Sequence, residues 1–148
     1  MVSGVTKLLK LIFWLTIILL YPMLISIYVT LPLFIGFAGL MFIIGIERDK
    51  VIYILFATVY MLNLEINLSL PLFLLLISTT LFYIFLNNKL HILKLCRGCV
   101  NVLTVISINL IYFFILTLYD IVTQQHSINF DGLIVISIIY DIIAAVLL

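Results

Sequence analysis

Long apolar runs separated by short polar clusters dominate this chain, and the runs are apolar on every face. Residues 11–20 and 72–77 show no regular alternation of apolar and polar positions, which transmembrane β-strands require. A membrane-spanning helix needs about 20 apolar residues, with a range of about 17 to 25. The pattern therefore predicts an all-α, polytopic membrane protein with about six transmembrane helices, at 8–29, 31–46, 51–64, 70–86, 100–122 and 132–148.

Two of the predicted helices begin at nearly the same motif. Thr-Leu-Pro-Leu-Phe occupies 30–34 and Ser-Leu-Pro-Leu-Phe occupies 69–73. We expect Thr30 and Ser69 to cap their helices and the prolines to lie in the first turns, where a missing N–H costs nothing. The repetition indicates either a duplicated helical hairpin or the same helix-start chemistry used twice, and we favour the second interpretation.

Composition supports a membrane protein and excludes a soluble globule. The chain is 67% hydrophobic and 9% charged, with a mean hydropathy of +1.47, whereas soluble domains are about a quarter charged. So small a fold cannot hide this much apolar surface from water. The net charge is only +1, without the basic stripe that nucleic-acid binding needs, so no nucleic-acid partner is expected.

The basic residues predict the orientation. If the N-terminus is cytoplasmic, the inner segments are the N-terminal tail and the loops after the second and fourth helices. These segments contain all seven basic residues, which are Lys7, Lys10, Arg48, Lys50, Lys89, Lys94 and Arg97. Because cytoplasmic loops are enriched in Lys and Arg, we expect both termini in the cytoplasm. The first apolar run is too long for a signal peptide and lacks a cleavage site, so we expect it to be retained in a single domain, 1–148.

Cys96-Arg97-Gly98-Cys99 is the one cysteine motif in the sequence. A CxxC motif can form a redox pair or half of a zinc site, and a membrane thiol oxidoreductase using Cys96 and Cys99 is one functional alternative. His91 could add a third metal ligand, but a structural zinc site needs about four. We therefore expect two reduced thiols at the cytoplasmic surface, no bound metal and no cofactor.

Asp141 lies near the middle of the last predicted helix, where an ionisable group costs about 2.5–3.5 kcal/mol unless it has a partner. Asn109 lies at a similar depth in the fifth helix, so we predict an Asn109–Asp141 hydrogen bond, with Tyr112, Ser137 and Tyr140 as further candidates. The group is either a proton relay or a polar clamp between helices. A relay normally has several deep acids, so we favour the clamp. On that view an Asp141→Asn protein should keep its function.

The other notable polar residues fall on the predicted outer side. Glu65, Asp120 and Asp131 lie near helix ends; Asp131 is placed to cap the last helix. Glu65 and Asp120 are expected to be solvated, or to form an acidic rim for a partner.

A patch of small residues, Gly36, Ala38 and Gly39, lies in the second predicted helix. Small residues permit the backbones of two helices to approach closely. We expect this patch to pack inside the bundle rather than to mediate dimerisation.

The arrangement resembles MreD, the small membrane subunit of the bacterial rod-shape (elongation) machinery. The resemblance lies in the length, the six helices and the cytoplasmic ends. It is best at 63–73, where Glu65 closes one helix, a short polar turn follows and a new apolar helix begins. The family more often has Asp with glycines at this turn. Its proline–acid pair at the second helix is replaced here by Pro32 and Leu33.

This resemblance implies a non-enzymatic scaffold in the bacterial inner membrane that contributes to cell shape and peptidoglycan synthesis. Its implied partners are a cell-wall synthase and a single-span shape protein. The MreD fold is also similar to that of substrate-binding subunits of vitamin transporters, so a small-molecule binding subunit is the alternative. The sequence contains no HExxH, GxSxG or phosphate-binding glycine loop, and an enzyme is not expected.

Overall fold

The computed structural model describes residues 2–28, 31–87, 96–124 and 133–147, and these are helical with short connections. The all-α prediction is thus confirmed for the part of the chain that the structure describes. The elements, in chain order, are α1 (Val2–Ile27), α2 (Ile35–Glu47), α3 (Val51–Asn67), α4 (Leu74–Phe82), the π-helical η1 (Tyr83–Asn87) that continues it, α6 (Arg97–Thr123) and α7 (Leu133–Leu147).

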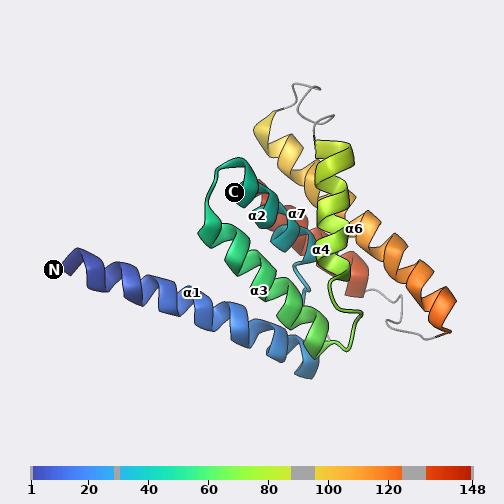
Figure 1. Cartoon of the computed structure of the whole chain (residues 1–148), viewed down its shortest axis with the longest axis horizontal. Helices are drawn as coiled ribbons and strands as arrows, with labels where there is room; N and C mark the ends of the chain where they lie inside the picture. Colours follow the sequence, from blue (N-terminus) through green and yellow to red (C-terminus); the bar gives the residue numbers. More distant parts are fainter. Residues whose placement is uncertain (1, 29–30, 88–95, 125–132, 148) are drawn as a thin grey trace.

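Helix α2 is the centre of the bundle. It packs against α3, α4, α6 and α7, while α1 lies along α3 and extends beyond the other helices toward the N-terminus (Figure 1). The α2 helix can be central because small residues line it, and Ala38 is only 4% exposed. Around it the apolar core is formed by buried side chains of several helices, including Met61, Leu64, Leu75 and Leu116.

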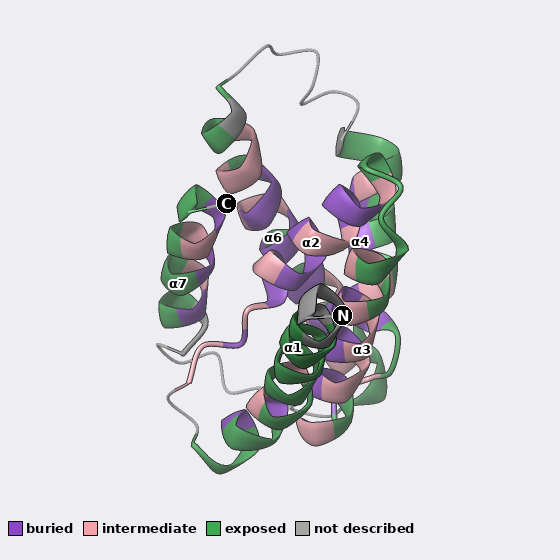
Figure 2. Cartoon of the chain, turned by 90° about the vertical axis from the view of Figure 1, so that its left-hand side faces the viewer, coloured by how far each residue is buried: buried purple, intermediate pink, exposed green. Residues whose placement is uncertain are grey.

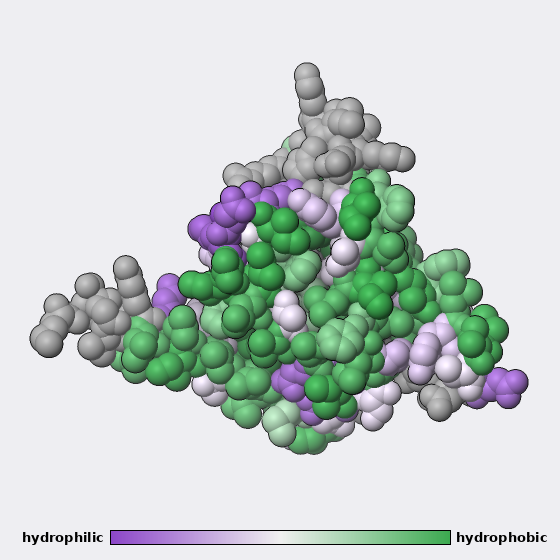
Figure 3. Space-filling view, in the orientation of Figure 1, coloured by the Kyte–Doolittle hydropathy of each residue, from purple (hydrophilic) through white to green (hydrophobic). Residues whose placement is uncertain are grey.

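The outside of the bundle is strongly apolar. Most of the described side chains of α1 are exposed although they are large and hydrophobic (Figure 2). The face seen in Figure 3 is largely hydrophobic, with hydrophilic groups confined to a few places. Two described helical segments, Leu8–Ile27 and Gly98–Thr123, are long and apolar enough to cross a membrane. Four more apolar helical segments are shorter than 18 residues: Ile35–Glu47, Val51–Asn67, Leu74–Leu86 and Val135–Leu147.

The starts of the second and fourth helices differ from the prediction. These helices begin at Ile35 and Leu74 rather than at 31 and 70, so the two prolines precede the helices and Ser69 does not cap α4; Thr30 lies outside the described residues. The reason is local. A residue before proline is disfavoured in the helical region, and the phenylalanine that closes each motif adopts a left-handed conformation, with φ 51° at Phe34 and 67° at Phe73. That conformation interrupts a helix of L-residues.

Candidate functional site

Asp141 binds backbone amides at the start of α2. Its Oδ2 accepts hydrogen bonds from Gly36 N and from Asn109 Nδ2, both at 2.9 Å, and its Oδ1 accepts from Phe37 N at 3.3 Å. The first turn of any helix leaves N–H groups without intrahelical partners, and a carboxyl group also interacts favourably with the positive end of the helix dipole. The predicted Asn109–Asp141 bond is present, and it belongs to a larger arrangement in which α7 caps α2.

The four residues that lead into α2 are also held by side chains. Ser137, one turn before Asp141 on α7, accepts a hydrogen bond from Leu33 N at 3.1 Å. The hydroxyl of Tyr60 on α3 donates to Leu33 O at 2.8 Å, and that of Tyr21 on α1 donates to Pro32 O at 2.9 Å. Since buried backbone groups need partners, these side chains make it possible for a non-helical segment to pass through the bundle.

Glu65 does for α4 what Asp141 does for α2. Its Oε2 accepts from Phe73 N at 2.7 Å and its Oε1 from Leu75 N at 2.6 Å. The residue is fully buried, with 0% exposure, so the prediction of a solvated Glu65 on the outer rim is wrong. The physical reason is that α3 continues to Asn67 instead of ending at 64, which places Glu65 on a helix that faces the start of α4.

The two motifs therefore share one helix-start geometry, which is what the use of the same helix-start chemistry twice would produce. In both, a left-handed phenylalanine precedes a helix whose first amides bind a buried carboxyl group. The carboxyl groups do not share a position in the motif. Glu65 precedes Phe73 by eight residues, whereas the residue eight positions before Phe34 is Ser26, and Asp141 comes from the far end of the chain. A simple duplicated hairpin does not account for this difference.

The remaining polar candidates of this region separate into buried and exposed ones. Tyr112 is fully buried, and its hydroxyl has no hydrogen-bond partner among the described residues; the same holds for Oδ1 of Asn109. Tyr140 is 48% exposed and does not join the Asp141 arrangement, which corrects its assignment to the clamp. The correction follows from the helical period: Ser137 and Asp141 are four residues apart on the same face of α7, and Tyr140 falls beside that face.

Gly36 and Gly39 bring α2 against its neighbours, which confirms the predicted close packing inside the bundle. A Cβ at Gly36 would overlap Asn109 Nδ2 and lie 2.7 Å from Val105 Cγ1 and 2.9 Å from Val105 O. One at Gly39 would lie 2.7 Å from Thr79 Cγ2.

We expect Gly36→Ala to destabilise the bundle by about 2 kcal/mol, because overpacking in a tight core costs about 1–3 kcal/mol. The added methyl group must also displace Asn109 from Asp141. The measurement is the free energy of unfolding in mixed micelles. Gly98→Ala is the matched control, since a Cβ at Gly98 meets nothing within 4 Å. Equal stability of the two variants would contradict the packing described here.

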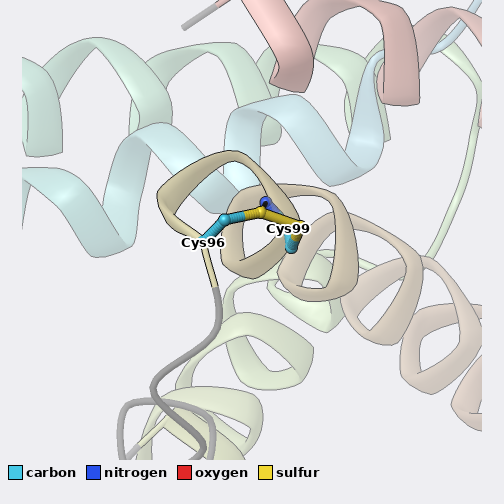
Figure 4. Close-up of a disulfide and its surroundings, with 2 residues drawn as sticks. All are labelled: Cys96 and Cys99. Atoms are coloured by element: carbon cyan, nitrogen blue, oxygen red, sulfur yellow. Dashed lines mark hydrogen bonds between the residues drawn. A yellow bond between two sulfur atoms is a disulfide. The ribbon is translucent and has the colours of Figure 1, made fainter.

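Cys96 and Cys99 form a disulfide at the start of α6, with a Cα–Cα distance of 5.2 Å (Figure 4). The expectation of two reduced thiols is therefore wrong. The motif holds its two cysteines within one helical turn, close enough for their sulfurs to bond. Bonded sulfurs cannot serve as thiolate ligands, and the described residues contain no group of three His, Cys, Asp or Glu placed to hold a metal ion. His91 lies outside the described residues.

Because Glu65 is buried, it does not contribute to an exposed acidic rim. Asp120 is partly exposed near the end of α6. Asp131, and with it the predicted cap of the last helix, lies outside the described residues. What the structure assembles instead is a pair of buried carboxyl groups, each binding the start of a short helix.

Comparisons with protein-family models, with curated proteins and with solved structures gave no match to this chain.

Proposed function

We propose that the chain is a multi-pass protein of the bacterial inner membrane that crosses the bilayer six times, with both termini in the cytoplasm. The two longest apolar helices and the apolar exterior support this proposal. The short helices are compatible with this proposal if the non-helical segments that precede them also lie within the membrane. The α2 helix has 13 residues, or about 20 Å at about 1.5 Å per residue. The three residues before Phe34 add up to about 10 Å, and together these lengths match a hydrocarbon core of about 30 Å.

Within the membrane, the protein acts as a non-enzymatic scaffold that binds other membrane proteins through its lateral surface. The observation that carries this proposal is the use of both deep carboxyl groups as helix caps. Asp141 accepts hydrogen bonds at the start of α2, and Glu65 accepts them at the start of α4. Buried ionisable groups in membranes often mark transport pathways, but these two hold the fold together, and the exterior is left to contact partners.

Of the known scaffold types, the MreD-like one matches the length and the predicted topology. The protein would then help to organise peptidoglycan elongation and cell shape, with a cell-wall synthase and a single-span shape protein as partners. Depletion in the native bacterium should cause cell rounding, and purification in mild detergent should recover the synthase with the protein. Normal shape together with no recovered synthase would refute this role.

One observation favours a small-molecule binding subunit as the second candidate. The Tyr112 hydroxyl and Asn109 Oδ1 are buried polar atoms that have no partner within the described part of the chain. They lie one helical turn apart on α6, and convergent polar groups are typical of ligand sites. Under this alternative, depletion leaves the shape normal and abolishes uptake of a vitamin-type nutrient. Asn109→Leu should then lower uptake without preventing membrane insertion.

A further inference from the structure

The disulfide occupies the position from which a helix can stabilise a thiolate. Cys96 is the N-cap residue of α6, and its Sγ accepts a hydrogen bond from Cys99 N at 3.3 Å. The α6 helix is 27 residues long, and its N-terminus carries partial positive charge. Arg97, between the two cysteines, adds a formal positive charge. Thiolates are favoured at helix N-termini and beside basic residues.

The pair is also accessible. Both cysteines and Gly98 are exposed, and the space beside Gly98 is open. Among the residues that the structure describes, no side chain therefore blocks approach to the sulfurs from that side. A thiol–disulfide exchange needs such access, because a second thiolate must reach one of the sulfurs along the S–S bond.

The bond contributes little as a structural cross-link. The bonded cysteines are separated by three positions in the sequence, and a disulfide constrains the unfolded chain less when its loop is short. In the proposed topology the start of α6 faces the cytoplasm, where disulfides are usually transient and catalytic or redox-sensing. The position at the helix N-terminus, the accessibility of the cysteines and the short loop therefore all favour a disulfide that forms and breaks reversibly.

We propose that Cys96 and Cys99 form a thiol–disulfide exchange site that accepts electrons from a dithiol partner. A thiolate of the partner attacks Cys96 Sγ, the Cys96–Cys99 bond breaks, and Cys99 leaves as a thiolate that takes up a proton. The partner's second thiolate then attacks the partner's first sulfur, which is bonded to Cys96 in the mixed disulfide, and Cys96 leaves as a thiolate. The partner is oxidised to a disulfide, and the CxxC pair gains two electrons. This activity goes beyond the proposed scaffold function; only the cytoplasmic placement of the pair rests on the topology proposed above.

The test uses the full-length protein in detergent, with glutathione disulfide as the trapping probe. After reduction, Cys99→Ser should form a mixed disulfide with the probe at pH 6.5 at least tenfold faster than Cys96→Ser does, because only Cys96 has the N-cap position. In the unmodified protein, dithiothreitol should open the bond and oxidised glutathione should restore it, both followed by mass-tag alkylation. Circular dichroism verifies that both variants are folded.

Equal trapping rates for the two serine variants would overturn the proposal, as would a bond that resists excess dithiothreitol in the folded protein. A faster Cys96→Ser variant would also overturn it, since the attacking sulfur would then be the wrong one. A defect in cell shape is not among these readouts. Failure of the scaffold role would therefore leave the exchange chemistry standing, and failure of the exchange would leave the scaffold role intact.

Discussion

Asp141→Ala is expected to lower the free energy of unfolding by about 3 kcal/mol, because an unsatisfied buried donor costs about 1–3 kcal/mol. The substitution removes the acceptor of three N–H donors: Gly36 N, Phe37 N and Asn109 Nδ2. Partial relaxation, with water or a shifted side chain, keeps the total below the sum of three full penalties. The measurement is equilibrium unfolding in mixed micelles of a mild and a denaturing detergent, followed by helical circular dichroism.

Asp141→Asn should be destabilised by an intermediate amount, about 1–2 kcal/mol. An amide offers one acceptor oxygen, and its NH₂ group would face a backbone N–H. Tyr140→Phe on the same helix is the matched control, since Tyr140 is exposed. If Asp141→Ala is as stable as this control, the cap on α2 does not have the importance assigned to it.

Glu65→Ala is expected to cost about 2 kcal/mol, since it leaves the buried Leu75 N and the partly buried Phe73 N without an acceptor. The loss should be local at first. Amide hydrogen exchange should accelerate at the start of α4 before it does in α6. Glu65→Gln should lie between the alanine variant and the natural protein, as for Asp141.

The control for Glu65 is Asp49→Asn. Asp49 is an exposed acid in the turn after α2 with φ 52°, and asparagine tolerates that left-handed conformation. A stability loss confined to the Glu65 variants would support the cap. The opposite pattern, with Asp49→Asn less stable than Glu65→Ala, would mean that surface charge rather than capping governs stability here.

The sequence predicts the parts of the fold that depend on local pattern. Apolar runs bounded by polar clusters locate all the described helices, although the start of α1 differs from the prediction by six residues and those of α2 and α4 by four. The Asn109–Asp141 bond is predictable for a simple reason. In a long apolar helix a deep carboxyl group must find a polar partner, and few polar side chains are available near the middle of α6.

The parts that could not be predicted depend on tertiary partners. A left-handed Phe34 or Phe73 is unfavourable by itself, and in each case a carboxyl group from another helix caps the helix that follows. Two tyrosine hydroxyls also bind the segment before Phe34. The sequence predicts a solvated Glu65 because a helix end rich in polar residues usually faces water. In the structure α3 continues for about one more turn, to Asn67, and Glu65 is buried. The near-identity of the two five-residue motifs was the available signal, because the same unusual sequence twice indicates the same unusual backbone twice.

The six-crossing topology is tested most directly by labelling single cysteines in a Cys96→Ser/Cys99→Ser background. In intact cells, Asn67→Cys and Gln124→Cys, at the ends of α3 and α6, should react with a membrane-impermeant maleimide. Lys50→Cys and Lys94→Cys should react only after the membrane is permeabilised. If Lys50→Cys and Lys94→Cys react from opposite sides of the membrane, the basic residues are not gathered at one surface and the six-crossing bundle is contradicted.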